Sequence, residues 1–144
     1  HRRPSLLLRS TMLPLTLDDA VARADDLLQS VIADYPKHLE TTFAEMEGSA
    51  RSRQWMDIQI AAHDLKGQAA TLGWPIIGLV ARSLEAAIRT RDKTHFEEAV
   101  RVHVDCMRLC LATNIRKPIP AAARFLEELA ALVARMGKSA VEAG

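Results

Sequence analysis

Apolar residues recur every three or four positions along most of the chain, which is the spacing of an amphipathic helix. No window of four to eight residues alternates between apolar and polar in the manner of a strand. The first helix is predicted to begin at Thr16, a good N-cap, and to carry one apolar face. That face consists of Leu17, Val21, Ala24, Leu28, Val31 and Ile32. Pro36 is expected to end this helix, because a proline disfavours helical geometry in the residue before it.

The same spacing predicts five further helices separated by turn residues. The third helix holds most of the unusual chemistry and is expected to follow a cap at Ser52. A capping box at Thr94–Glu97 is expected to open the fifth. The predicted ranges, each approximate at its ends, are Pro36 to Glu47, Arg53 to Leu72, Pro75 to Arg91, Thr94 to Leu111 and Ala121 to Met136.

These elements predict an all-α fold, an antiparallel four-helix bundle with additional N-terminal and C-terminal helices. Residues 1–15 are expected to be an N-terminal extension or tail, and 16–113 the bundle. A linker at 114–120, an additional C-terminal helix at 121–137 and a tail at 138–144 complete the predicted division.

Composition narrows the function classes. A chain of 144 residues is long enough to form one domain with its own core. Its residues are 49% hydrophobic and only 4% aromatic, a composition that favours helices. A net charge of +1 argues against nucleic-acid binding, and no apolar run approaches the ~18 residues that a bilayer span needs. Cys106 and Cys110 indicate a reducing compartment, so a cytoplasmic location is expected. The basic start at Arg2, Arg3 and Arg9 is interpreted as a tail rather than a membrane contact.

His63 is the candidate working residue of the third helix. On a helical wheel it lies about 160° from Leu65, and Leu65 belongs to the apolar stripe with Ile58, Ala62 and Ala69. Gly67 and Ala70 share the outward face with His63. A glycine in the middle of a helix costs roughly 1 kcal/mol relative to alanine, which makes sense if another protein must approach the ring closely. Lys66 beside the ring can offset negative charge, so the group favours accepting and donating a phosphoryl group.

The run His63-Asp64-Leu65-Lys66-Gly67, with Ala70 and Leu72-Gly73 after it, resembles the motif of histidine-containing phosphotransfer (HPt) domains. The segment "VARSLEAAIR" is similar to the Leu-Glu stretch of the next helix in that family. The resemblance covers about residues 20 to 112. Gln68, the stiff Trp74-Pro75 corner and the last helix depart from the common pattern.

The resemblance implies that His63 is phosphorylated, usually on Nε2, that Lys66 contacts the phosphoryl group and that Gly67 gives clearance. Glu85 falls where the family often has a polar residue that reaches Nδ1 and fixes the tautomer. Family members shuttle phosphoryl groups between receiver-domain aspartates and have no kinase activity of their own. The implied partners are response-regulator receiver domains and a hybrid histidine kinase. No cofactor of its own is expected, since the Mg²⁺ belongs to the receiver.

Partner docking is expected around Gln59, Gly67, Ala70 and Gly73, with Arg82 and also Arg89 at the rim, where they could steer an acidic receiver pocket. A different hypothesis is a helical adaptor that binds a receiver domain or kinase without transfer, although an adaptor would need neither His63 nor Lys66.

A metal-binding bundle is the third hypothesis. His103, Cys106 and Cys110 have a spacing that could place three soft ligands on one side of a helix. A boundary histidine with two packing thiols is the favoured interpretation, and no metal is expected. Trp55 and Trp74 are expected to pack in the core or at its boundary.

Overall fold

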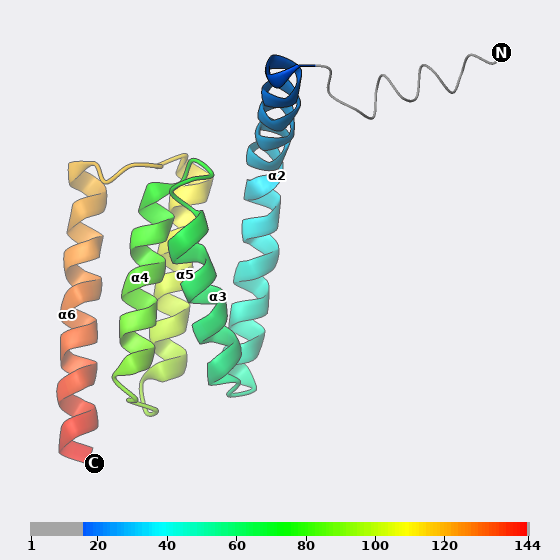
Figure 1. The fold of residues 1–144 in the computed structure, drawn as a ribbon. Helices are drawn as coiled ribbons and strands as arrows, with labels where there is room; N and C mark the ends of the chain where they lie inside the picture. Colours follow the sequence, from blue (N-terminus) through cyan, green and yellow to red (C-terminus); the bar gives the residue numbers. More distant parts are fainter. Residues whose placement is uncertain (1–15, 144) are drawn as a thin grey trace. The chain divides into compact units, whose positions relative to one another are not determined.

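The computed structural model describes residues 16–143, and within that range the chain folds into five helices and no strands. The all-α prediction is therefore confirmed. The helices are α2 (Leu17–Arg51), α3 (Trp55–Gln68), α4 (Pro75–Arg89), α5 (Phe96–Thr113) and α6 (Pro120–Ala143) (Figure 1). The interpretation of residues 1–15 as an extension lies outside the described residues.

The chain divides at Pro36 into two compact units, His1–Tyr35 and Pro36–Gly144. The described part of the first unit is the N-terminal half of α2. Its start is confirmed, since the Thr16 hydroxyl accepts a hydrogen bond from the Asp19 backbone N–H at 3.0 Å. The apolar face predicted for this segment is largely exposed, with Leu17 85% and Val21 65% accessible.

The predicted break at Pro36 is wrong, because α2 continues through the proline without interruption. A proline inside a helix removes one backbone hydrogen bond and crowds a carbonyl four residues earlier. The bias that it imposes on the preceding residue is a preference, not a prohibition, and long helical segments on both sides outweigh it. In the part of α2 that follows the proline, Leu39, Phe43 and Met46 are buried, as predicted.

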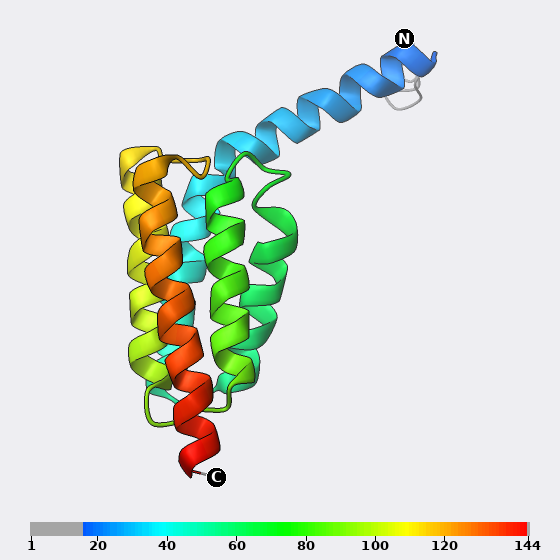
Figure 2. The same ribbon diagram turned by 90° about the vertical axis from the view of Figure 1, so that its left-hand side faces the viewer.

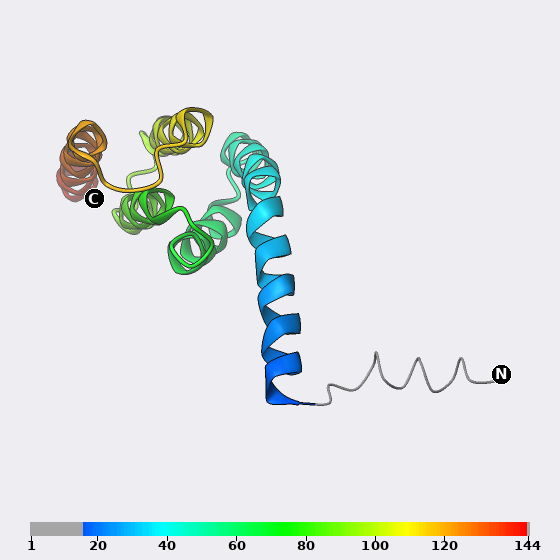
Figure 3. The same cartoon turned by 90° about the horizontal axis from the view of Figure 1, so that it is seen from above.

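The second unit contains the bundle. The C-terminal half of α2 forms a four-helix bundle with α3, α4 and α5, and α6 packs alongside α4 and α5 (Figures 2 and 3). An ion pair between Arg108 and Glu47, 2.8 Å long, connects α5 with α2. Trp55 packs edge-on against Phe96 and Trp74 is buried, so both tryptophans pack as predicted.

Two predicted helix caps differ from the observed ones. The Ser52 hydroxyl bonds back to the Gly48 carbonyl at 2.7 Å, and α3 starts three residues later than that serine. Thr94 does not form the expected capping box, because the carboxylate of Asp92 accepts the backbone N–H of Thr94 and of His95 instead. α3 therefore begins after Gln54 without a side-chain cap, whereas before α5 the accepting side chain is Asp92, two residues earlier than the predicted cap.

The last helix is longer than predicted. α6 continues to Ala143, through the segment expected to be a tail. Ala122, Leu129 and Met136 are buried along its length, and Met136 packs in a small core cluster with Ala87 and Ala99. The helix therefore continues beyond Met136, the last of its buried residues.

Candidate functional site

The site is built on the outward face of α3. The inward face buries Ile58, Ala62 and Leu65, and this fixes the rotation of the helix. Consequently the side chain of His63 is 64% exposed. Gly67 and Ala70 are also exposed, as the helical wheel predicted.

A buried carboxylate from α4 holds the exposed imidazole. Oε2 of Glu85 lies 3.0 Å from Nδ1 of His63, and the Glu85 side chain is 4% exposed. Oε1 of the same carboxylate accepts a 2.7 Å hydrogen bond from Nζ of Lys66. Arg89, one turn further along α4, approaches Oε2 at 3.4 Å. The two helices thus bring together the three residues predicted as the catalytic set, and Arg89 joins them.

These cations keep the carboxylate charged. The hydrogen bond from Lys66 is the main reason that the pKa of Glu85 lies below its ordinary value. Burial opposes this effect, while the hydrogen bond from His63 and the charge of Arg89 also lower the pKa. An ionised carboxylate can only accept a hydrogen bond, so in the neutral ring Nδ1 carries the hydrogen and donates it to Glu85. Nε2 then carries the lone pair, and among residues 16–143 no group bonds to it.

The surface beside the ring is open. A Cβ added at Gly67 would meet no neighbouring atom within 4 Å. Gly78 of α4 has a different role, which the sequence analysis missed. A Cβ there would lie 3.6 Å from the Lys66 carbonyl oxygen, in ordinary contact, so this glycine lines the contact between α3 and α4. Gly67 therefore leaves the surface beside His63 open, whereas Gly78 allows α3 and α4 to pack closely.

Two exposed apolar side chains on the same face were also missed. Met56 and Ile60 precede His63 by seven and three residues, and they are 66% and 54% exposed. The helical wheel that placed Gly67 on this face could have found them. Together with Gly67, and with Ala70 in the turn just after α3, they form a surface that flanks the imidazole with apolar and small residues, named here the α3 outer face.

The other residues predicted for docking have mixed positions. Arg82 is exposed and shares a cleft of about 510 Å³ with Lys66 and Ala70. Gln59 is half-buried. Gly73 is half-buried in the turn after α3 and has a φ of 97°. This backbone conformation favours glycine, so the residue type is explained without a contact to another protein. A partner contact at Gly73 stays a prediction.

His103 has no ring nitrogen left for a metal. Nδ1 bonds to the Ala99 carbonyl at 2.7 Å and Nε2 to the Ser83 hydroxyl at 2.9 Å. The ring is fully buried rather than at the boundary, and burial lowers its pKa. Burial likewise raises the pKa of Cys110 to about 11, which keeps this thiol protonated. The part of the chain that the structure covers contains no group of three or more potential metal ligands.

The fold and the site together define a class of protein, a helical bundle that presents one imidazole oriented by a buried carboxylate. The family model described as Hpt domain matches residues 17–137, and the chain belongs to this family of histidine phosphotransfer domains of two-component systems. The match includes most of α6. No curated protein and no solved structure matches the chain. Across residues 16–143, none of the helices has the length and apolar character to cross a membrane.

Proposed function

We propose that His63 takes a phosphoryl group from the aspartate of one receiver domain and passes it to the aspartate of another. The observation that carries the proposal is the 3.0 Å contact between Nδ1 of the exposed ring and buried Glu85, beside Lys66. This arrangement leaves Nε2 as the nucleophile in a fixed orientation.

The transfer step balances without any further reactant. The lone pair of Nε2 attacks the phosphorus of the aspartyl phosphate, and the bond between phosphorus and the carboxylate oxygen breaks. The aspartate leaves as a carboxylate, and the ring holds a P–N bond with its positive charge facing Glu85. Lys66 is 34% exposed, so its ammonium group can turn from Glu85 towards the phosphoryl oxygens. The second transfer reverses these events on a different receiver.

The α3 outer face is the proposed docking surface. Met56 and Ile60 offer apolar area, while Gly67 and Ala70 let the receiver's active site reach the ring. Arg82 lies at the rim, where positive charge complements the acidic residues that hold Mg²⁺ in a receiver. The chain would then need no cofactor and no kinase activity of its own. This role also places the protein in the cytoplasm, with receiver domains and a hybrid histidine kinase as its partners.

The test is transfer of ³²P from a phosphorylated receiver domain to the chain. We expect the wild type to be labelled and His63→Gln to stay unlabelled. His95→Gln is the matched control, because His95 is also exposed and also bonds through Nδ1 to a buried carboxylate. Label on His63→Gln would overturn the assignment. A wild type that binds the receiver and acquires no label would instead identify a non-transferring adaptor.

A further inference from the structure

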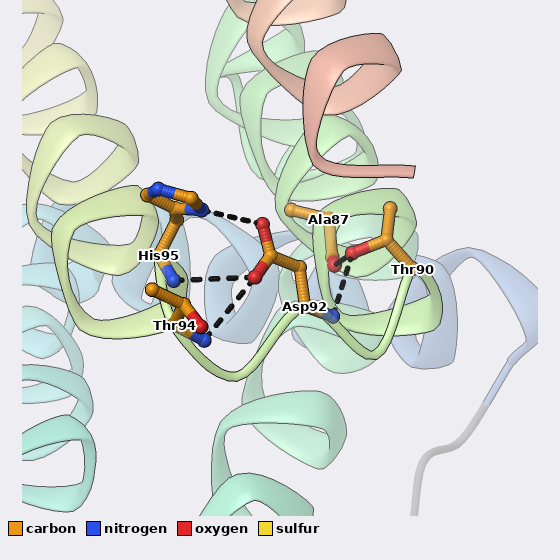
Figure 4. Close-up of polar contacts among 5 residues, drawn as sticks. All are labelled: Ala87, Thr90, Asp92, Thr94 and His95. Atoms are coloured by element: carbon orange, nitrogen blue, oxygen red, sulfur yellow. Dashed lines mark hydrogen bonds and ion pairs between the residues drawn. The ribbon is translucent and has the colours of Figure 1, made fainter. Parts of the chain in front are cut away.

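A second histidine is held by a buried carboxylate just before α5. Nδ1 of His95 lies 2.7 Å from Oδ2 of Asp92, whose side chain is 3% exposed. The other oxygen of Asp92 accepts the backbone N–H groups of Thr94 and His95 at 3.1 and 3.4 Å (Figure 4). The loop behind Asp92 is tied in turn to Thr90, whose hydroxyl accepts the Asp92 backbone N–H. The ring is therefore anchored through one nitrogen, and Nε2 bonds to nothing else among the described residues.

His95 lines a cleft of about 640 Å³ against the C-terminal part of α6. The α6 residues that line it are Leu132, Arg135, Met136, Lys138, Ser139 and Glu142. Arg135 and Lys138 form no ion pair within residues 16–143, in contrast to Arg101 and Arg108, which do. Two cations without an ion pair, a hydroxyl and an imidazole thus border one cleft, which Glu142 also lines, and the carboxylate of Asp92 lies behind the imidazole.

The floor of the cleft is apolar. Met136 is 2% exposed and packs with Ala87 and Ala99, and Leu132 packs against that cluster. An apolar floor under a cationic rim suits a ligand that has an anionic end and an apolar body. None of the residues around the cleft belongs to the group at His63, so this site does not depend on the proposed function.

We propose that this cleft binds a small phosphate monoester with an apolar substituent. The guanidinium of Arg135 presents paired N–H donors to two phosphate oxygens, and the Lys138 ammonium and Ser139 hydroxyl can donate to the third. Nε2 of His95 accepts a hydrogen bond from the P–O–H group of the monoanion. The substituent lies over Leu132 and Met136. Glu142 opposes the anion, so its removal should strengthen binding.

The experiment follows the imidazole protons of His95 by NMR while phenyl phosphate, inorganic phosphate or benzoate is added to the full chain. We expect a saturable shift with phenyl phosphate below about 10 mM. The double variant Arg135→Gln/Lys138→Gln should bind about tenfold more weakly. The matched control is Lys117→Gln/Arg124→Gln, which removes the same charge from exposed positions outside the cleft and should bind like the wild type. Glu142→Gln should bind several-fold more tightly.

Several results would overturn the proposal. Shifts that rise linearly without saturation mean that there is no site. Equal weakening in the two double variants means that only overall charge matters. Benzoate binding as tightly as phenyl phosphate removes the phosphate class, and inorganic phosphate doing so removes the apolar substituent. Circular dichroism of every variant confirms that the helices are intact.

Discussion

At the scale of single residues, one buried carboxylate organises the centre. Glu85 accepts a hydrogen bond from Nδ1–H of His63 through one oxygen and a hydrogen bond from Lys66 through the other. A nearly buried charge is tolerable only when it is paired and hydrogen-bonded, and here both conditions hold. The same interactions that stabilise the carboxylate also select the tautomer that exposes Nε2.

Replacing Glu85 with glutamine tests this link. The amide keeps the size of the side chain but accepts a weaker hydrogen bond from Nδ1–H, because the bond is no longer charge-assisted. We expect the rate of phosphoryl transfer to His63 to fall roughly tenfold, or about 1.4 kcal/mol of barrier. The rate is measured by rapid-quench labelling from a phosphorylated receiver. An unchanged rate would show that Glu85 serves folding alone.

Gly67 is predicted to lower the stability of α3 while leaving His63 accessible to a receiver domain. Gly67→Ala should raise the free energy of unfolding by up to about 1 kcal/mol, because alanine is the better helix former and the Cβ meets no neighbour. Transfer to His63 should nevertheless slow, and Gly67→Leu should slow it further. Gly137→Ala is the control, another helical glycine with room for a Cβ and far in sequence from His63. It should be stabilised and should transfer normally. Urea unfolding and the transfer assay give the two readouts.

At the scale of elements, α3 has one buried face that packs in the bundle and one exposed face that carries His63. The inward face sets the rotation of the helix, and this rotation decides which residues surround His63. The outward face carries Met56 and Ile60, two apolar side chains that are each more than half exposed.

The double variant Met56→Ser/Ile60→Ser should keep its stability and lose affinity for a receiver by about tenfold, since the lost contacts are apolar. Leu109→Ser is the control, because Leu109 is 55% exposed on α5 and lies outside the α3 outer face. Isothermal titration calorimetry with the receiver measures the affinity. Equal losses in both variants would remove the docking surface from α3.

The last helix is an integral part of its unit. Leu129 of α6 is 2% exposed, so Leu129→Ala should cost about 2–5 kcal/mol of unfolding free energy. Val141→Ala in the same helix should cost little, because Val141 is 81% exposed. Denaturant unfolding followed by circular dichroism compares the two. Near-equal stability of the variants would mean that α6 does not pack as described.

At the scale of the whole molecule, the lowered pKa of Glu85 makes stability depend on acid pH. In the unfolded chain, Glu85 binds a proton as the pH falls through its ordinary pKa of 4.5. In the folded chain, the pKa is lower, so the carboxylate is still ionised at that pH. The stabilisation is therefore present above pH 4.5 and is lost as the pH falls through the lower folded value.

Urea midpoints measured between about pH 6 and pH 2 should show this loss. Glu85→Gln should flatten the dependence. Glu98→Gln is the control: the Glu98 pKa is also lowered by its bond to Arg101, but this pair is exposed and contributes little. An identical slope in wild type and Glu85→Gln would exclude the mechanism.

The sequence by itself determined the fold class and pointed to His63 as the candidate reactive group. Period-3.6 patterning is local, so it predicts helices and places His63 opposite Leu65 without any tertiary information. Its errors are also local in origin: Pro36 was expected to end a helix that continues, and the segment after Met136 was expected to be a tail. Backbone preferences of about 1–3 kcal/mol yield to packing and helix length, which a local pattern does not contain.

Only the tertiary structure decided what surrounds the reactive groups. The resemblance pointed from His63 to Glu85, 22 residues away, but the 3.0 Å contact and the burial of the carboxylate depend on how α3 and α4 pack. The cleft at His95 combines a loop with residues about 40 positions later, on α6. Contacts between distant segments arise from the shape and rotation of whole helices, and no periodicity along the chain encodes them.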